Sequence, residues 1–188
     1  MSDVVKRLIA SITSCTDKET SPAVIVEQVK RIALNLAKDT SWVRPEYYEI
    51  DKEQGMGITV LNREGEGSAF VEVISWMPGL GIEPHDHQTW GVVLGINGIE
   101  TNIGWQRLDD GSRPGHAKLT KVSETNIGKG EAVHFLPDDI HSVFNNGDGP
   151  SLSSHIYGRD LANVERSEFD PINKLERPCP KRIRKSHD

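Results

Sequence analysis

The chain has little cysteine, no long apolar run and no excess of basic residues, and each shortage excludes a class of protein. Its two cysteines, Cys15 and Cys179, are too far apart in sequence to make a disulfide framework or a zinc knuckle. No run reaches the ~18 apolar residues of a membrane-spanning helix. With 22 Lys and Arg against 28 Asp and Glu, the net charge of −6 lacks the basic field that attracts nucleic acid. The N-terminus has no apolar signal-peptide core. We therefore expect a cytoplasmic protein with neither nucleic acid nor a membrane as partner.

Residues 1–45 predict a helical segment packed on a larger domain. Apolar residues recur at three-to-four spacing from Val4 to Ile12, which is typical of an amphipathic helix. After a polar break at Thr16–Ser21, Ser21-Pro22 is a typical helix start, and the apolar pattern continues to about Leu36. A membrane or partner helix is the less favoured interpretation of this pattern.

From residue 46 to 170 the pattern changes to short β-rich runs separated by turn residues, which predicts an all-β sandwich or barrel. Asn97-Gly98 predicts a two-residue hairpin, and Glu64–Gly67 predicts another turn. Residues 171–188 are basic and broken by proline, which favours a solvated or surface-tied tail over a nucleic-acid-binding arm. The expected strands are Gly57–Leu61, Ala69–Trp76, Trp90–Ile96, Glu100–Arg107, Lys118–Val122, Ala132–Phe135 and Leu152–Tyr157.

Three histidines form a candidate metal site. His85 and His87 would point to the same face of a strand, and His141 follows a proline turn downstream. An isolated His-x-His pair in a β protein is more often structural, but the third histidine favours a shared metal. His134 fits structural packing better than a fourth ligand, and Asp86 would point away from the metal.

Ser153, His155 and Tyr157 would lie on one face of a later strand, within reach of successive hydrogen bonds. A Tyr hydroxyl backed by an imidazole and a second hydroxyl suits a proton relay. The alternative is an ordinary half-buried strand with polar residues turned inward.

The two histidine segments resemble the paired motifs of the cupin superfamily, which implies a small jelly-roll-like β-barrel that holds a metal. Gly91 stands where that family usually has a glutamate ligand. Three neutral imidazoles would leave a divalent metal its full charge, which favours a thiolate but also suits zinc with an activated water. The matching residues are Gly79, His85, His87 and Gly98 in the first motif and Gly130, Pro137, His141 and Asn145 in the second.

The pattern Ser-x-His-x-Tyr downstream of a three-histidine cupin site resembles the thiol dioxygenases, a family that includes cysteine dioxygenase and 3-mercaptopropionate dioxygenase. The resemblance runs from about Trp76 to Arg166, roughly half of the chain. It implies Fe(II) held by His85, His87 and His141, with both atoms of O2 added to the substrate sulfur to give a sulfinate. It also implies that Ser153, His155 and Tyr157 orient the substrate.

The resemblance also guides the choice of substrate. The stretch Gly57–Thr59 lacks the arginine of mammalian-type cysteine dioxygenases, and Val92 stands where their cross-linked cysteine would be. Arg166 matches an arginine implicated near the substrate in the bacterial mercaptopropionate branch, and Arg159 is a further candidate. Surface ion pairs are the alternative role for both.

We therefore predict oxidation of a small mercapto-carboxylic acid, of the 3-mercaptopropionate or mercaptosuccinate type, by a monomer or small homo-oligomer. The alternatives are a cysteine dioxygenase, a non-oxidative isomerase, lyase or hydrolase that uses zinc, nickel or manganese, and a cupin that only stores a metal or binds a ligand.

Overall fold

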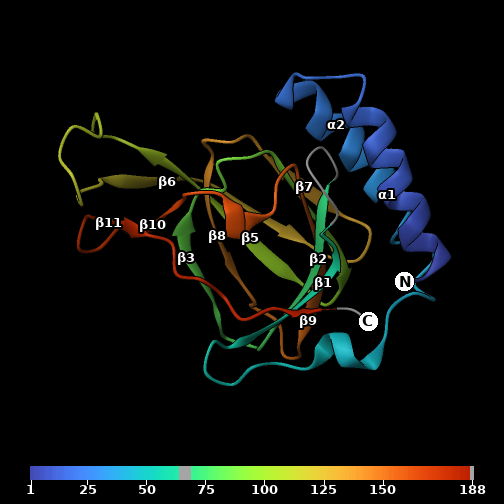
Figure 1. The fold of residues 1–188 in the computed structure, drawn as a ribbon. Coiled ribbons are helices and arrows are strands. Elements are labelled where there is room, and N and C mark those ends of the chain that lie inside the picture. The colour runs from blue at the N-terminus through green and yellow to red at the C-terminus, as the bar shows by residue number, and fades with distance from the viewer. Residues whose placement is uncertain (64–68, 187–188) are drawn as a thin grey trace.

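A computed structural model of the protein describes residues 1–63 and 69–186 (Figure 1). It is mainly β, with two helices at the N-terminus and two six-stranded sheets, as the strand pattern predicted. The turn expected at Glu64–Gly67 lies outside the described residues.

Both expected helices are present. α1 spans Asp3–Thr16 and begins at Ser2, whose hydroxyl accepts a hydrogen bond from the amide of Val5 at 3.3 Å. α2 spans Pro22–Ala33, with Pro22 in its first turn. Their buried faces pack with residues of one sheet in a single apolar cluster, and α2 contacts β4 and β7 of that sheet. Among the described residues, no helix is both long enough and apolar enough to cross a membrane.

The first sheet has the strand order β12-β1-β2-β9-β4-β7 and the second has the order β11-β10-β3-β8-β5-β6. The strands of the first are β1 (Met56–Asn62), β2 (Phe70–Trp76), β4 (Gly91–Asn97), β7 (Ala132–Phe135), β9 (Ser151–Tyr157) and β12 (Lys185–Ser186). Those of the second are β3 (Gly81–His85), β5 (Glu100–Arg107), β6 (Leu119–Ile127), β8 (Ile140–Phe144), β10 (Ser167–Asp170) and β11 (Leu175–Pro178). Short 3-10 turns, η1 (Pro45–Tyr48) and η2 (Leu161–Asn163), lie outside the sheets.

The hairpin predicted at Asn97-Gly98 is wrong. β4 pairs with β7 and β9, whereas β5 pairs with β6 and β8 in the other sheet, so this turn carries the chain from one sheet to the other. Gly98 has φ +69°, and a Cβ there would lie 2.9 Å from the Cα of Ser151. The glycine is therefore needed for a close crossing rather than for a two-residue hairpin. The crossing places the start of β5 beside β9.

The C-terminal segment, residues 179–186, runs from the end of β11 in the second sheet to the edge of the first sheet (Figure 1). β12 pairs in parallel with β1, and Gln54 exchanges two hydrogen bonds of 3.1 Å with the backbone of Ile183. Arg184 forms an ion pair of 2.9 Å with Glu72 in β2. The segment is thus held by backbone pairing and by a charge contact that reaches into the sheet.

Candidate metal centre

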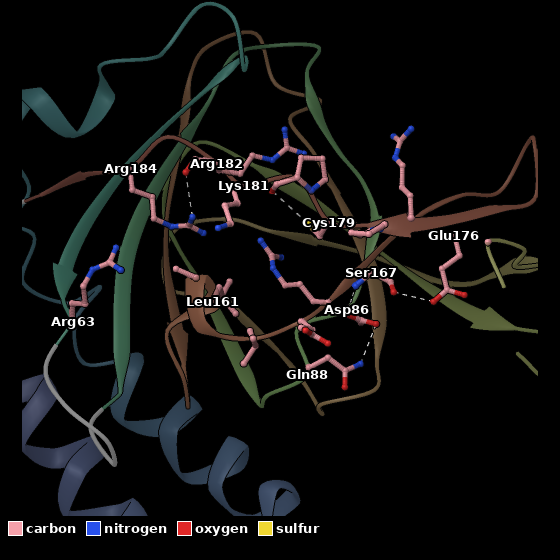
Figure 2. Close-up of a pocket in the computed structure, with 18 residues that line it drawn as sticks. Arg63, Asp86, Gln88, Leu161, Ser167, Glu176, Cys179, Lys181, Arg182 and Arg184 are labelled. Atoms are coloured by element: carbon pink, nitrogen blue, oxygen red, sulfur yellow. Dashed lines mark hydrogen bonds between the residues drawn. The ribbon is translucent and has the colours of Figure 1, made fainter.

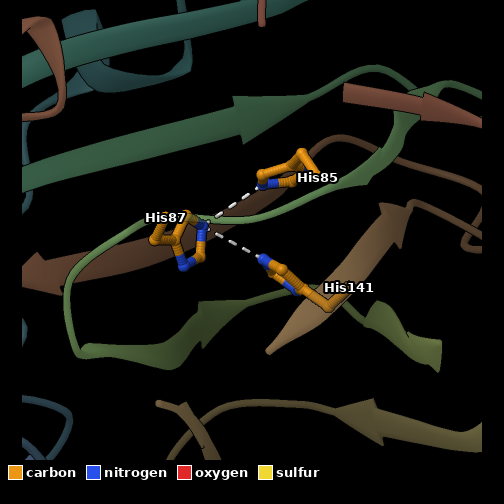
Figure 3. A group of neighbouring side chains, drawn as sticks. All are labelled: His85, His87 and His141. Atoms are coloured by element: carbon orange, nitrogen blue, oxygen red, sulfur yellow. Dashed lines mark hydrogen bonds between the residues drawn. The ribbon is translucent and has the colours of Figure 1, made fainter. Parts of the chain in front are cut away.

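His85, His87 and His141 come together as a buried group that could hold a metal ion (Figure 3). The Nε2 atom of His87 lies 3.2 Å from the Nε2 of His85 and 3.2 Å from the Nε2 of His141. All three candidate ligand atoms lie within 4.8 Å of one another.

The reason given from the sequence for this convergence needs correction. β3 ends at His85, so His87 is not on the same strand. His85 is paired with His141 of β8, which brings those two rings together across the sheet. His87 reaches them through the turn that follows, where Gln88 has φ +53°. The cluster is therefore built by strand pairing and a tight turn, and side-chain alternation does not account for it.

Hydrogen bonds and burial leave the imidazoles ready to bind a metal. The Nδ1 of His85 lies 2.9 Å from the carbonyl oxygen of Glu83, and the Nδ1 of His141 lies 3.1 Å from the Oδ1 of Asn102. Each Nδ1 therefore donates, and each Nε2 keeps its lone pair. Burial lowers the pKa of His85 to about 3 and holds the pKa values of His87 and His141 well below the ordinary value. Neutral imidazoles of this kind suit Fe, Zn, Cu or Ni.

Gly91 supplies no carboxylate to the three histidines, and the space around it is already filled. A Cβ at Gly91 would lie 3.0 and 3.1 Å from ring atoms of Tyr157 and 3.4 Å from the Nδ1 of His87. The rings of His87 and Tyr157 are 4.8 Å apart between centroids. The tyrosine ring thus fills the space that a larger residue at position 91 would need.

Ser153, His155 and Tyr157, which we call the relay, form a continuous hydrogen-bonded chain in β9. The Oγ of Ser153 lies 2.9 Å from the Nε2 of His155, whose Nδ1 lies 3.0 Å from the hydroxyl of Tyr157. All three side chains are buried. Burial also raises the pKa of Tyr157 far above its ordinary value, which keeps the phenol protonated.

Glu100 and Asn102 complete the network, and neither was singled out from the sequence. The Oε2 of Glu100 accepts hydrogen bonds from Ser153 Oγ at 2.6 Å and from Trp76 Nε1 at 3.1 Å. Its Oε1 accepts from Asn102 Nδ2 at 3.0 Å. Burial raises the pKa of Glu100, but its interaction with His155, whose Nε2 lies 3.8 Å from Oε2, and the hydrogen bonds from Ser153 and Asn102 outweigh that effect and leave the pKa lowered. The Glu-x-Asn spacing, which puts both residues on one face of β5, was the available signal.

A small cavity of about 30 Å³ adjoins the histidines. It is lined by His85, His141, His155 and Tyr157, and most of its other lining residues are apolar. Three arginines also line it: Arg166, Arg182 and Arg184.

The same three arginines line a larger cavity of about 840 Å³, which therefore adjoins the small one. Figure 2 shows Lys181, Arg182 and Arg184 on one side of it, with Asp86 and Gln88 on the other. The two cavities therefore share their cationic lining, and the smaller one is also lined by His85 and His141.

The arginines differ in how far they are already neutralised. Arg184 pairs with Glu72 at 2.9 Å, and Arg182 pairs with Glu168 at 3.0 Å. The Nε of Arg182 is nonetheless buried without a hydrogen-bond partner in the described part of the chain. Arg166 is half-buried, and its side chain has no ion pair or hydrogen bond with any described residue.

The two arginines predicted from the sequence therefore lie in different surroundings. Arg166 lines both cavities. Arg159 is exposed just after β9 and lines neither. Arg182 and Arg184 were missed because the basic C-terminus was expected to be a tail, although the Arg-x-Arg spacing puts both on one side of an extended chain.

No protein-family model matches the chain, and no curated protein matches it. Solved structures do resemble it. They include an oxalate oxidase in complex with the substrate analogue glycolate (16% identity, 66% of this chain and 63% of that chain, TM-score 0.46). They also include an uncharacterised Klebsiella pneumoniae protein with a double-stranded β-helix domain (14% identity, 70% and 99%, TM-score 0.47). A third is a cupin superfamily protein from Desulfitobacterium hafniense (12% identity, 60% and 84%, TM-score 0.42).

This chain spans less than two thirds of the oxalate oxidase that it matches. With TM-scores below 0.5, these likenesses carry no argument about its activity. The chain itself is a mainly β protein of two sheets, with a buried three-histidine group that could hold a metal.

Proposed function

We propose that the protein is a non-haem Fe(II) thiol dioxygenase that converts a small mercapto-carboxylic acid to its sulfinate. The observation that carries the proposal is the contact between two chemical units. A neutral three-histidine group and the relay meet where the ring of Tyr157 packs against His87. Arginines line the cavity beside them.

The donor set supports binding of a thiolate. Three neutral ligands leave a divalent ion its full charge, so an anionic sulfur is favoured as the next ligand. Bound Fe(II) would supply the redox chemistry that joins both atoms of O2 to the sulfur. The protein supplies orientation and a partly dry pocket, for which the apolar walls of the small cavity are suited.

The cations support a carboxylate on the substrate. Arg166 is not neutralised by any described residue, so its planar guanidinium is free to bind both oxygens of a carboxylate. The ammonium group of cysteine would meet the same arginines, and Glu72, the carboxylate lining the small cavity, is already paired with Arg184. Like-charge contact therefore favours 3-mercaptopropionate or mercaptosuccinate over cysteine.

The test is oxygen uptake by the iron-loaded protein, with the sulfinate measured by mass spectrometry. The panel is 3-mercaptopropionate, mercaptosuccinate, cysteine, and cysteamine as a thiol without a carboxylate. We expect uptake to equal sulfinate formed, with the mercapto-carboxylates turned over best. Tyr157→Phe should lower kcat by about 10²- to 10⁴-fold if the hydroxyl takes part in proton transfer.

Each other outcome contradicts part of the proposal. Equal turnover of cysteine would favour a cysteine dioxygenase. Turnover of a substrate without O2 by the zinc-, nickel- or manganese-loaded protein would favour a non-oxidative metalloenzyme. No uptake with any thiol would exclude the thiol dioxygenase class.

A further inference from the structure

Glu100 is a buried carboxylate at the crossing between the two sheets, behind the relay and outside the lining of both cavities. We propose that it is a positioning residue: its carboxylate sets the direction of hydrogen bonding along the relay and, through Asn102, the tautomer of His141. The inference rests on the proposed function only in taking Tyr157 as the group that faces the substrate. The hydrogen-bond order itself holds whatever reaction the site performs.

The direction in the relay follows from the partners of Ser153. Its Oγ lies 2.6 Å from Glu100 Oε2 and 3.5 Å from the carbonyl oxygen of Ile74, and both can only accept. The single hydroxyl proton of Ser153 therefore goes to one of these oxygens. At 2.9 Å from the Nε2 of His155, Ser153 Oγ must then accept the hydrogen bond, so His155 carries its proton on Nε2.

The same direction of hydrogen bonding continues from His155 to Tyr157, which lines the small cavity. A neutral imidazole protonated on Nε2 has a bare Nδ1, which accepts a hydrogen bond from the hydroxyl of Tyr157 at 3.0 Å. The proton of Tyr157 is thus directed away from the cavity. Its oxygen is left with lone pairs that can accept a hydrogen bond from a donor in the cavity that Tyr157 lines.

The carboxylate of Glu100 also affects the candidate metal ligand His141, through Asn102. Asn102 Nδ2 donates to Glu100 Oε1 at 3.0 Å, which fixes the amide with its Oδ1 toward His141. At 3.1 Å from that Oδ1, the Nδ1 of His141 must carry the proton, and its Nε2 keeps a lone pair for a metal. One carboxylate with acceptor atoms on two sides therefore fixes both halves of the site.

Glu100→Gln tests this, because it changes one oxygen into a donor with almost no change in shape. The new NH2 group cannot face Trp76, whose Nε1 only donates, so it must take the position of Oε1. Asn102 must then turn its own oxygen toward the new amide. The amide nitrogen of Asn102 would face His141 and favour the tautomer without a lone pair on Nε2.

The readout is the affinity of the metal-free protein for Co²⁺, measured by calorimetry, which needs no catalytic turnover. We expect Glu100→Gln to weaken binding by about 10- to 100-fold, the usual cost of losing support behind a metal ligand. Glu131→Gln is the matched control, because Glu131 also accepts a hydrogen bond through its carboxylate but lies on the surface. It should leave the affinity unchanged.

A second substitution should restore binding. In Glu100→Gln/Asn102→Asp, the new amide donates to the new carboxylate, whose other oxygen accepts from His141. The charge is moved by two positions along β5 and every hydrogen bond is kept, so we expect Co²⁺ affinity within a few-fold of wild type. Wild-type affinity in the folded single variant, or a folded double variant that binds no better than the single one, would overturn the inference.

A measurement on the unmodified protein decides the matter if a variant does not fold. Imidazole ¹⁵N NMR of the metal-free protein should find His155 protonated on Nε2 and His141 protonated on Nδ1. The opposite tautomer at either residue would overturn the inference. This result is also independent of whether any thiol is oxidised, so failure of the proposed function and failure of the inference are told apart.

Discussion

The ion pair between Arg184 and Glu72 should make the C-terminal segment a large contributor to the stability of the domain. The side chain of Glu72 is 1% exposed and that of Arg184 is 11% exposed, so Arg184→Ala would leave a carboxylate buried without its cation. Breaking a buried pair in this way costs ~3–5 kcal/mol. Because water can approach from the partly exposed arginine side, we expect the lower end, about 3 kcal/mol.

That loss is measurable as thermal unfolding followed by circular dichroism. In a protein of 150–250 residues, 1 kcal/mol shifts Tm by about 2–4 °C, so Arg184→Ala should lower Tm by roughly 6–12 °C. Lys185→Ala is the matched control in the same segment. Its pair with Glu49 is exposed, at 52% and 62%, and should contribute less than about 1 kcal/mol.

A double variant separates the charge from the packing. Adding Glu72→Gln to Arg184→Ala removes the unpaired buried charge, so much of the lost Tm should return. If Arg184→Ala unfolds at the same temperature as Lys185→Ala, the segment does not stabilise the sheet through this pair, and the reasoning is refuted.

Three further predictions concern the site. Arg166→Gln should raise KM for mercapto-carboxylates by about 10- to 100-fold, since a charged hydrogen bond contributes ~1.5–3 kcal/mol. It should leave cysteamine kinetics and Tm nearly unchanged, and an equal loss with cysteamine would contradict carboxylate binding. Gly91→Ala should lower turnover by displacing the ring of Tyr157 while Co²⁺ affinity stays within a few-fold, and wild-type turnover would contradict the steric argument. The metal-free protein should lose stability in urea unfolding as pH falls from about 6.5 toward 3, because His85 is neutral when folded and takes up a proton when unfolded. The loss should be about 1.4 kcal/mol per pH unit for this group, and a flat profile would contradict the depressed pKa.

The sequence predicted strands well where apolar residues alternate with polar ones or form a continuous run. It predicted them less well where a proline or exposed residues interrupt that hydrophobic pattern. β1, β2, β4 and β9 are buried along most of their length, and each was expected. β3 was not, because it contains a proline and is partly exposed before it reaches His85. The three histidines that could hold a metal were nevertheless singled out, since residue type and spacing identify them without a correct strand assignment.

Local turn chemistry failed at Asn97-Gly98 because a longer-range constraint determines the turn. Asn-Gly favours a hairpin in isolation, but the backbone beside Gly98 is that of Ser151, at the start of β9. The way the two sheets are arranged brings these segments together. A short stretch of sequence carries no information about that arrangement. The same constraint hid the role of Glu100, whose partner Ser153 is 53 residues away.

The basic C-terminus is a second case in which a contact between distant residues could not be predicted from the sequence. Composition favours a solvated or surface-tied tail, because four of residues 178–186 are basic: Lys181, Arg182, Arg184 and Lys185. Arg184 finds its carboxylate 112 residues earlier in β2. Only the folded sheet makes that contact available.

Arg166 lines the small cavity without an ion pair to any described residue, although the chain as a whole is acidic. A net charge of −6 argues against a polyanionic partner, which would sample the whole surface. A small anion samples only its surroundings, because charges further away than about 8 Å are screened at physiological salt. Near the histidines, Glu72 pairs with Arg184 and Glu168 pairs with Arg182, which leaves Arg166 as the lining arginine without an ion pair to a described residue, while the histidines themselves are neutral. Rates should therefore rank thiols by the negative charge they carry, with cysteamine slowest, although the protein as a whole repels anions.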